Sequence, residues 1–147
     1  MDFEQLAFIE KWRRRAARGV VVALDGRRGD LLVTIRVGEL GERLDLRGRD
    51  ATGSARKARL SIGDRVTMAI EYRASEVAAG AGREVPGGLV AAGSIVEGVV
   101  AATGEIVEVD CGAPVLVHGS TLPGAKEGDA IRFVVADEGT AYLIPSR

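Results

Sequence analysis

The chain has 147 residues, of which 46% are hydrophobic and 28% charged, with 20 Lys and Arg against 21 Asp and Glu. These proportions are typical of a globular protein, and the length suits one ordinary domain or two very small ones. No stretch approaches the ~20 consecutive apolar residues of a membrane-spanning helix, and the first residues lack the pattern of a secretory signal. We therefore expect a cytoplasmic protein that has no membrane partner.

The inventory of reactive side chains is short. The chain has one cysteine, Cys111, and one histidine, His118, which excludes an internal disulfide and a site built from several Cys or His ligands. Its glycines match neither a phosphate-binding loop nor a dinucleotide-binding motif. Glu108 and Asp110 share one face of a predicted strand, a pattern typical of a solvated sheet. We expect no metal, no cofactor and no enzymatic activity.

Near the start of the chain, apolar residues recur at every third position: Phe3, Leu6, Ile9 and Trp12. This spacing predicts an amphipathic helix over 2–17. Its last turns are strongly basic, which suits a helix C-terminus, and Gly19 is a plausible terminator. The apolar stripe of this helix is a candidate surface for a protein partner.

After Gly19 the apolar spacing changes to two, which indicates strands. Strands are predicted around four segments of the first half: 20–24, 31–37, 44–46 and 66–72. Residues 74–93 then contain 11 Ala and Gly out of 20, which predicts a linker. A second run of strands follows the linker.

The second run repeats landmarks of the first in the same order. The matching segments are Gly19–Ala23 with Gly98–Ala102, Asp30–Leu32 with Glu105–Val107, Leu44–Gly48 with Val115–Gly119, and Gly63–Met68 with Gly128–Phe133. This order favours a duplication. The periodicity alone is also compatible with one larger β-sandwich.

The two strand runs resemble small five-stranded barrels of the oligonucleotide/oligosaccharide-binding (OB) class, particularly its S1 and TRAM branches. Residues 98–144 carry the clearest resemblance, through Val115–Leu122 and Gly128–Phe133. It implies a mostly β protein in which two OB-like or SH3-like barrels follow the helix, with four segments: a helix at 1–18, a basic barrel at 19–73, a linker at 74–93 and an acidic barrel at 94–147.

Charge divides unequally between the halves. Residues 1–75 hold 16 Lys and Arg against 11 Asp and Glu, a net charge of +5, whereas residues 76–147 hold 4 against 10, a net charge of −6. A basic half suits an anionic partner. Opposite charges can equally attract two copies of the chain, so a homo-oligomer or another protein partner is the competing interpretation.

The resemblance implies binding of RNA or single-stranded DNA, which would use cations for the phosphates. The candidate contacts are Arg13, Arg14, Arg15, Arg18, Arg27, Arg28, Arg47, Arg49, Arg56, Lys57, Arg59 and His118. Exposed aromatic residues for base stacking are scarce in both strand runs, which departs from the usual pattern of such barrels.

One further resemblance concerns a cyclic dinucleotide. Arg14-x-x-x-Arg18, directly before the first predicted strand, is similar to the Arg-x-x-x-Arg motif of the PilZ family. The second part of that signature, Asp/Asn-x-Ser-x-x-Gly, does not follow in this chain. A PilZ-like function is therefore disfavoured.

Overall fold

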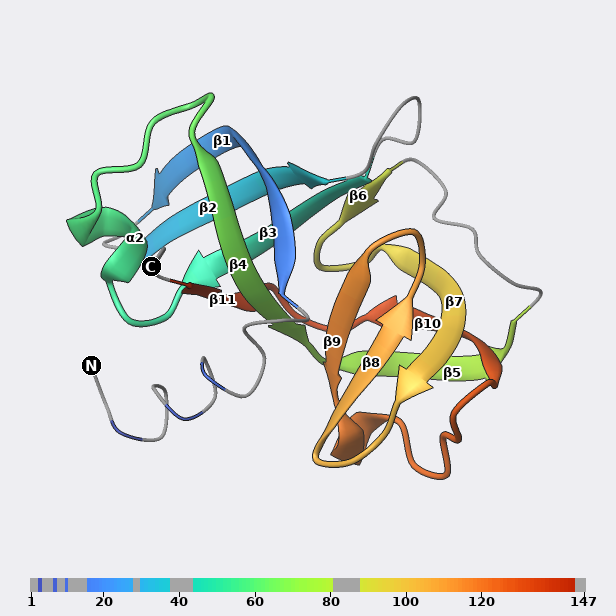
Figure 1. Cartoon of the computed structure of the whole chain (residues 1–147). Helices are drawn as coiled ribbons and strands as arrows, with labels where there is room; N and C mark the ends of the chain where they lie inside the picture. Colours follow the sequence, from blue (N-terminus) through green and yellow to red (C-terminus); the bar gives the residue numbers. More distant parts are fainter. Residues whose placement is uncertain are drawn as a thin grey trace.

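The computed structural model describes residues 3, 7, 10, 16–27, 30–37, 44–80 and 88–144. This part of the chain is mostly β (Figure 1). Its strands are β1 (Ala17–Arg27), β2 (Asp30–Val37), β3 (Leu44–Asp50), β4 (Arg65–Tyr72), β5 (Ala74–Ala79), β6 (Leu89–Val90), β7 (Ile95–Ala102), β8 (Ile106–Asp110), β9 (Pro114–His118), β10 (Ala130–Val135) and β11 (Gly139–Leu143). Two short helical elements follow β3 and β9: α2 (Ser54–Lys57) and the 3-10 turn η1 (Gly119–Thr121).

Five strands close into a barrel in the order β1-β2-β3-β11-β4, and β4 pairs back with β1. We call these strands the first barrel. Apolar residues alternate along them, and the inward set is fully buried, including Val21, Ile35, Leu46 and Met68. Because alternate side chains of a strand point to opposite faces, the residues between them point outward.

The same 11-stranded sheet continues beyond β4 in the order β9-β8-β7-β10-β5, and we call these five strands the second unit. Its buried residues include Val100, Val109, Val115 and Phe133. β9 also pairs in parallel with the end of β4, where Glu71 and Tyr72 lie opposite Leu116 and Val117. The first barrel and the second unit are therefore joined through the pairing of β4 with β9.

The halves of the chain exchange their last strands. β5, which follows β4 after a single residue, pairs with β10 of the second unit. β11, the last strand of the second half, pairs with β3 and β4 of the first barrel. Figure 1 shows red β11 beside the blue and green strands, and yellow-green β5 beside the yellow and orange ones. Each unit therefore needs residues from both halves.

This exchange corrects the expectation that each barrel is built from its own half. It also corrects the predicted linker, because 74–79 form β5 and 89–90 form β6, which pairs with β3. The small residues that suggested a flexible connection instead allow a close approach between strands: a Cβ on Gly80 would lie 2.5 Å from the carbonyl oxygen of Ile131. Residues 81–87 lie outside the described residues.

Tyr72 lies where the chain passes from the first barrel to the second unit. Its hydroxyl is 2.9 Å from the backbone oxygen of Arg47 and 3.3 Å from that of Val90. The side chain is 1% exposed, and this burial raises the pKa of the phenol. A Cβ on Gly139, at the start of β11, would lie 2.6 Å from the Tyr72 ring. The end of β4 and the start of β11 therefore pack closely against each other.

The helix predicted over 2–17 lies mostly outside the described residues. Its end differs from the prediction, because Ala17 and Arg18 already belong to β1 and pair with Met68 and Thr67 of β4. Ala17 and Arg18 can satisfy their backbone hydrogen-bonding groups by pairing with β4, and this pairing prevails over the helical spacing of the residues before them. No helix in the described part of the chain is long and apolar enough to span a membrane.

The two halves use the same turn before their fourth strand. In the first barrel, Val21 N–H donates to Asp64 O at 2.9 Å, and Gly63 N–H donates to Val21 O at 2.8 Å. The same two bonds have the same lengths in the second unit, where they join Val100, Asp129 and Gly128. Both turn glycines have positive φ, 98° and 92°, a conformation that glycine adopts without steric cost.

The halves also share a β-bulge. The register between β1 and β2 shifts between Val21 and Ala23, and that between β7 and β8 shifts between Val100 and Ala102. Gly19 and Gly98 occupy equivalent places before the bulge, because each pairs with the second residue of the strand that follows the shared turn. The shared bulge and turn provide a position-by-position correspondence between the two halves.

Candidate functional site

The closure of the first barrel brings outward residues of three strands together. Val20 of β1 lies opposite Arg36 of β2 and opposite Arg65 of β4. Their chain neighbours Val21 and Ile35 are fully buried, so Val20, Arg36 and Arg65 point outward. Neighbouring strands are ~4.8 Å apart, which places the two Arg Cα atoms roughly 10 Å apart on either side of a small apolar residue.

Two further charged residues border this row. Arg18 lies two residues before Val20 on the same face of β1 and is exposed. Asp45 of β3 lies opposite Arg36 and accepts two hydrogen bonds from its guanidinium, at 2.9 Å from Nε and 3.2 Å from Nη2. This carboxylate raises the pKa of Arg36. We call Arg18, Val20, Arg36, Asp45 and Arg65 the basic face.

The same positions carry no cations in the second unit. The correspondence between the halves gives three pairs of outward residues: Arg18 with Glu97, Arg36 with Asp110, and Arg65 with Ala130. Glu97 lies 3.7 Å from the Nε atom of Arg132, its neighbour on β10. The basic face is therefore a property of the first barrel and not of the shared strand arrangement.

The cations predicted from the sequence lie on several elements. Arg47 on β3 forms an ion pair with Glu138, at 2.6 Å and 3.2 Å, and Arg49 is exposed on the same strand. Three more are exposed on α2 and the turn after it: Arg56, Lys57 and Arg59. Of the predicted set, Arg18 alone belongs to the basic face. The described Arg and Lys residues of the predicted set are therefore distributed over β1, β3, α2 and the turn after α2.

Several predicted contacts lie outside the described residues. This applies to Arg13, Arg14, Arg15 and Arg28, to the side chain of Arg27, and to Leu6, Ile9 and Trp12 of the apolar stripe. Phe3 is described, and its side chain is 82% exposed. The roles of these residues stay predictions.

His118 occupies the seam between the first barrel and the second unit. Its Nε2 atom contacts Oε1 of Glu71, a β4 residue that is only 8% exposed. Burial is the main cause that raises the pKa of Glu71 and lowers the pKa of His118; nearby Arg73 opposes the first shift and adds to the second. Both directions favour the uncharged form of the side chain, as burial does in general. His118 therefore has a structural partner within the protein.

The aromatic residues of the two units do not form a stacking platform. Tyr72 and Phe133 are 1% and 0% exposed, as their sequence alternation predicts, and Tyr142 is half-buried. Cys111 is also buried, which raises its pKa to about 11, so this thiol is a poor nucleophile. The described residues contain no group of three or more His, Cys, Asp or Glu that could hold a metal ion.

Sequence reasoning missed Arg36 and Arg65 as site residues. Their outward positions could be predicted, because each alternates with buried apolar residues. Their proximity could not, because it depends on the pairing of β1 with both β2 and β4. The signal in the sequence is an arginine at the outward position of all three strands.

Together, these observations define a mostly β protein in which a five-stranded barrel exchanges strands with a second unit and carries a basic face. No protein-family model matches the chain, and no curated protein matches it significantly. Among solved structures it is similar to the cytoplasmic molybdate-binding protein ModG with molybdate bound. That match has a TM-score of 0.51 and 22% identity, and it covers 90% of this chain and 96% of the ModG chain. The similarity shows a shared fold.

Proposed function

We propose that this protein binds a small tetrahedral oxyanion, of the chemistry of molybdate, at the basic face. The observation that carries the proposal is the extent of the match with ModG, which covers 90% of this chain. A match to one small barrel would indicate little, because such barrels serve many functions. The match with ModG spans both units, so it includes how the two units are joined as well as the fold of each.

The chemistry of the basic face suits such a ligand. Guanidinium groups bind oxyanions through paired N–H donors and stay charged at all relevant pH values. Asp45 uses two of the donors of Arg36, and a guanidinium has five, so Arg36 can be positioned by Asp45 and still bind an anion. Val20, a small apolar residue that is 37% exposed, lies between Arg36 and Arg65 on this face.

The described structure gives less support to nucleic-acid binding. A single strand is usually held by a basic groove together with aromatic residues that stack on its bases. The aromatic residues of the two units are buried or half-buried, and the basic face is small. A compact anion therefore suits the described surface better than a polymer.

Isothermal titration of the full chain with sodium molybdate, sulfate and phosphate tests the proposal. We expect molybdate to bind and Arg65→Ala to weaken binding by about tenfold or more, because a charge-assisted pair contributes ~1.5–3 kcal/mol. Arg132→Ala on the second unit is the matched control, and we expect it to leave affinity unchanged. Thermal unfolding of each variant confirms that the fold is intact.

Two results would contradict the proposal. One is the absence of heat for all three anions in the folded wild-type protein. The other is equal weakening by Arg65→Ala and Arg132→Ala, which would indicate a general charge effect. Anisotropy of labelled single-stranded RNA and DNA, measured alongside, tests the alternative: tight binding that Arg65→Ala abolishes would assign the face to nucleic acid.

A further inference from the structure

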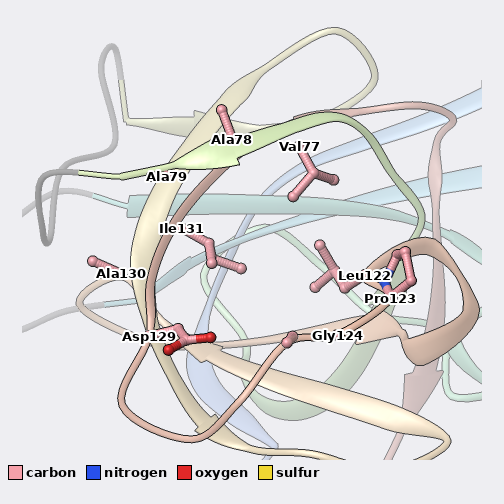
Figure 2. Close-up of a pocket in the computed structure, with 10 residues that line it drawn as sticks. Val77, Ala78, Ala79, Leu122, Pro123, Gly124, Asp129, Ala130 and Ile131 are labelled. Carbon is pink, nitrogen blue, oxygen red and sulfur yellow. The ribbon is translucent and has the colours of Figure 1, made fainter.

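A groove of about 440 Å³ lies in the second unit, between β5 and the segment that joins β9 to β10. Figure 2 shows Val77, Leu122 and Ile131 pointing toward the same space, with Asp129 at its edge. Leu122 and Ile131 are buried beneath it, whereas Val77 is 46% exposed. The groove therefore has an apolar floor, and its rim carries both apolar Val77 and charged Asp129.

The groove arises from a difference between the two halves. Fourteen residues join β3 to β4 in the first barrel, but only eleven join β9 to β10 in the second unit. The longer connection forms α2, whose Ala55 is fully buried, and places Leu60 against the core. The position equivalent to Leu60, five residues before the next strand, is Ala125. In place of α2 the second unit has the shorter 3-10 turn η1 (Gly119–Thr121), and in place of Leu60 it has the smaller Ala125.

The sheet beside the groove is also open on one side. β5 ends the strand order, and in the described part of the chain it pairs only with β10. Ala78 and Ala79, which line the groove with Val77, are exposed. This leaves an apolar surface without a covering element among the described residues, at the place where α2 packs in the first barrel.

The N-terminal segment of the chain has the complementary character. Its apolar residues recur every three positions, which suits a helix that lays one face into a groove. Phe3, at the start of the segment, is 82% exposed in this structure. Both surfaces would be covered if the segment of one copy entered the groove of another.

Charge favours the same contact. Four cations lie among the last residues of the segment: Lys11, Arg13, Arg14 and Arg15. The groove belongs to the half with net charge −6. Exposed Asp129 lines it, and exposed Glu76, Lys126 and Glu127 are close to its lining residues in the chain. Opposite potentials across an interface steer association and fix orientation.

We propose that residues 3–12 of one copy dock in the groove formed by Val77, Leu122 and Ile131 of a second copy. The segment takes the place that α2 occupies in the first barrel, and its basic end faces the acidic surroundings of the groove. This contact lies outside the basic face, so it holds whether or not that face binds an oxyanion.

Sedimentation velocity of the full chain over a wide range of protein concentration tests this proposal. We expect reversible self-association that weakens with added salt. Ala125→Leu fills the groove with the side chain that the first barrel has at the equivalent position, and Val77→Glu places a charge on its exposed rim. Each variant is expected to weaken association about tenfold or more, since a blocked central pocket removes the main contacts of an interface.

Ala58→Leu is the matched control, because Ala58 is exposed on the first barrel; we expect it to associate like wild type. Trp12, the one tryptophan of the chain, gives a second readout: its emission should shift to shorter wavelength with rising concentration, and Ala125→Leu should abolish the shift. A wild-type protein that is monomeric at all concentrations would overturn the proposal. So would association that Ala125→Leu and Val77→Glu leave intact, or Trp12 emission that does not change as the protein associates.

Discussion

The first barrel and the second unit share a strand arrangement, a β-bulge and a turn, yet they differ at the surface. The residues that fix the backbone correspond, as Gly63 does with Gly128. The outward residues differ in charge, as Arg36 does from Asp110. The comparison indicates that the interior and turns of the two units maintain the fold, whereas their outward positions can differ without changing it.

The exchange of β5 and β11 makes the two units depend on each other. Ala74 of β5 and Ala141 of β11 are equivalent buried residues, since they pair with Val135 and Ile70. We expect Ala74→Asp and Ala141→Asp each to lower the free energy of unfolding by ~3–5 kcal/mol, because each buries an unpaired charge. Urea denaturation followed by circular dichroism measures the loss.

Both variants should unfold in one transition, because each unit needs a strand from the other half. Ala78→Asp, at an exposed position of β5, is the control and should change the free energy of unfolding by less than about 0.5 kcal/mol. Two separate transitions in Ala141→Asp, one of them at the wild-type midpoint, would show that the units fold independently.

Gly19 and Gly98 provide a second matched pair. A Cβ on Gly19 would lie 2.5 Å from Arg36 O, and one on Gly98 would lie 2.7 Å from Asp110 O. Alanine at either position forces the neighbouring strand to move, and we expect a loss of ~1–3 kcal/mol in each case. Gly26→Ala, whose new Cβ would lie 4.0 Å from its nearest neighbour, is the control. Markedly unequal losses would weaken the correspondence between the halves.

The contact between His118 and Glu71 should make the stability of the fold depend on pH. Because His118 has a lowered pKa in the folded state, the unfolded chain binds its proton more readily. Stability should therefore fall as the pH drops from ~7 through the ordinary value of ~6.5 toward the lowered one. Glu71 has a raised pKa and opposes this trend, because the folded state binds its proton more readily.

Thermal unfolding of two variants between pH ~7 and ~5.5 separates the contribution of His118 from that of Glu71. His118→Gln should flatten the fall in stability on acidification, and Glu71→Gln should steepen it. Arg73, Glu105 and Tyr142 influence the pair electrostatically and are unchanged in both variants. Identical pH profiles in wild type and His118→Gln would show that this pair does not control the seam.

The smallest effect is expected at an exposed position of the shared turn. Ile62 in the first barrel is 69% exposed, and Glu127 occupies the equivalent place in the second unit. Ile62→Glu should change the free energy of unfolding by less than about 0.5 kcal/mol. A larger loss in chemical denaturation would show that Ile62 makes a contact that stabilises the first barrel.

The sequence predicted the β class and most strand positions, because alternation reveals which residues share a face. It failed where the backbone departs from regular alternation. Val20, Val22 and Leu24 alternate in the sequence, but the buried residue is Val21, and the bulge after it restores Leu24 to the core side. Alternation also left the repeat alignment undetermined, because Arg47 and Arg49 lie on the same face of β3: by register His118 corresponds to Arg49 and not to Arg47.

The strand exchange and the basic face could not be predicted, for a common physical reason. Periodicity identifies the inward side of a strand but not its neighbours, and both features depend on pairing between strands far apart in the chain. The composition of β5, rich in alanine, also resembles a linker until β10 is placed beside it. Arg18 was identified as a candidate from its charge, whereas Arg36 and Arg65 needed the closed barrel.

The most direct test transplants the surface of the second unit onto the first barrel. Equilibrium dialysis with molybdate would compare the wild-type chain with the double variant Arg36→Asp and Arg65→Ala, which carries the second unit's residues at both positions. We predict one bound molybdate per chain in wild type and none in the folded variant. Unchanged binding in the variant, or two equal sites per chain in wild type, would contradict the assignment of the ligand to the basic face.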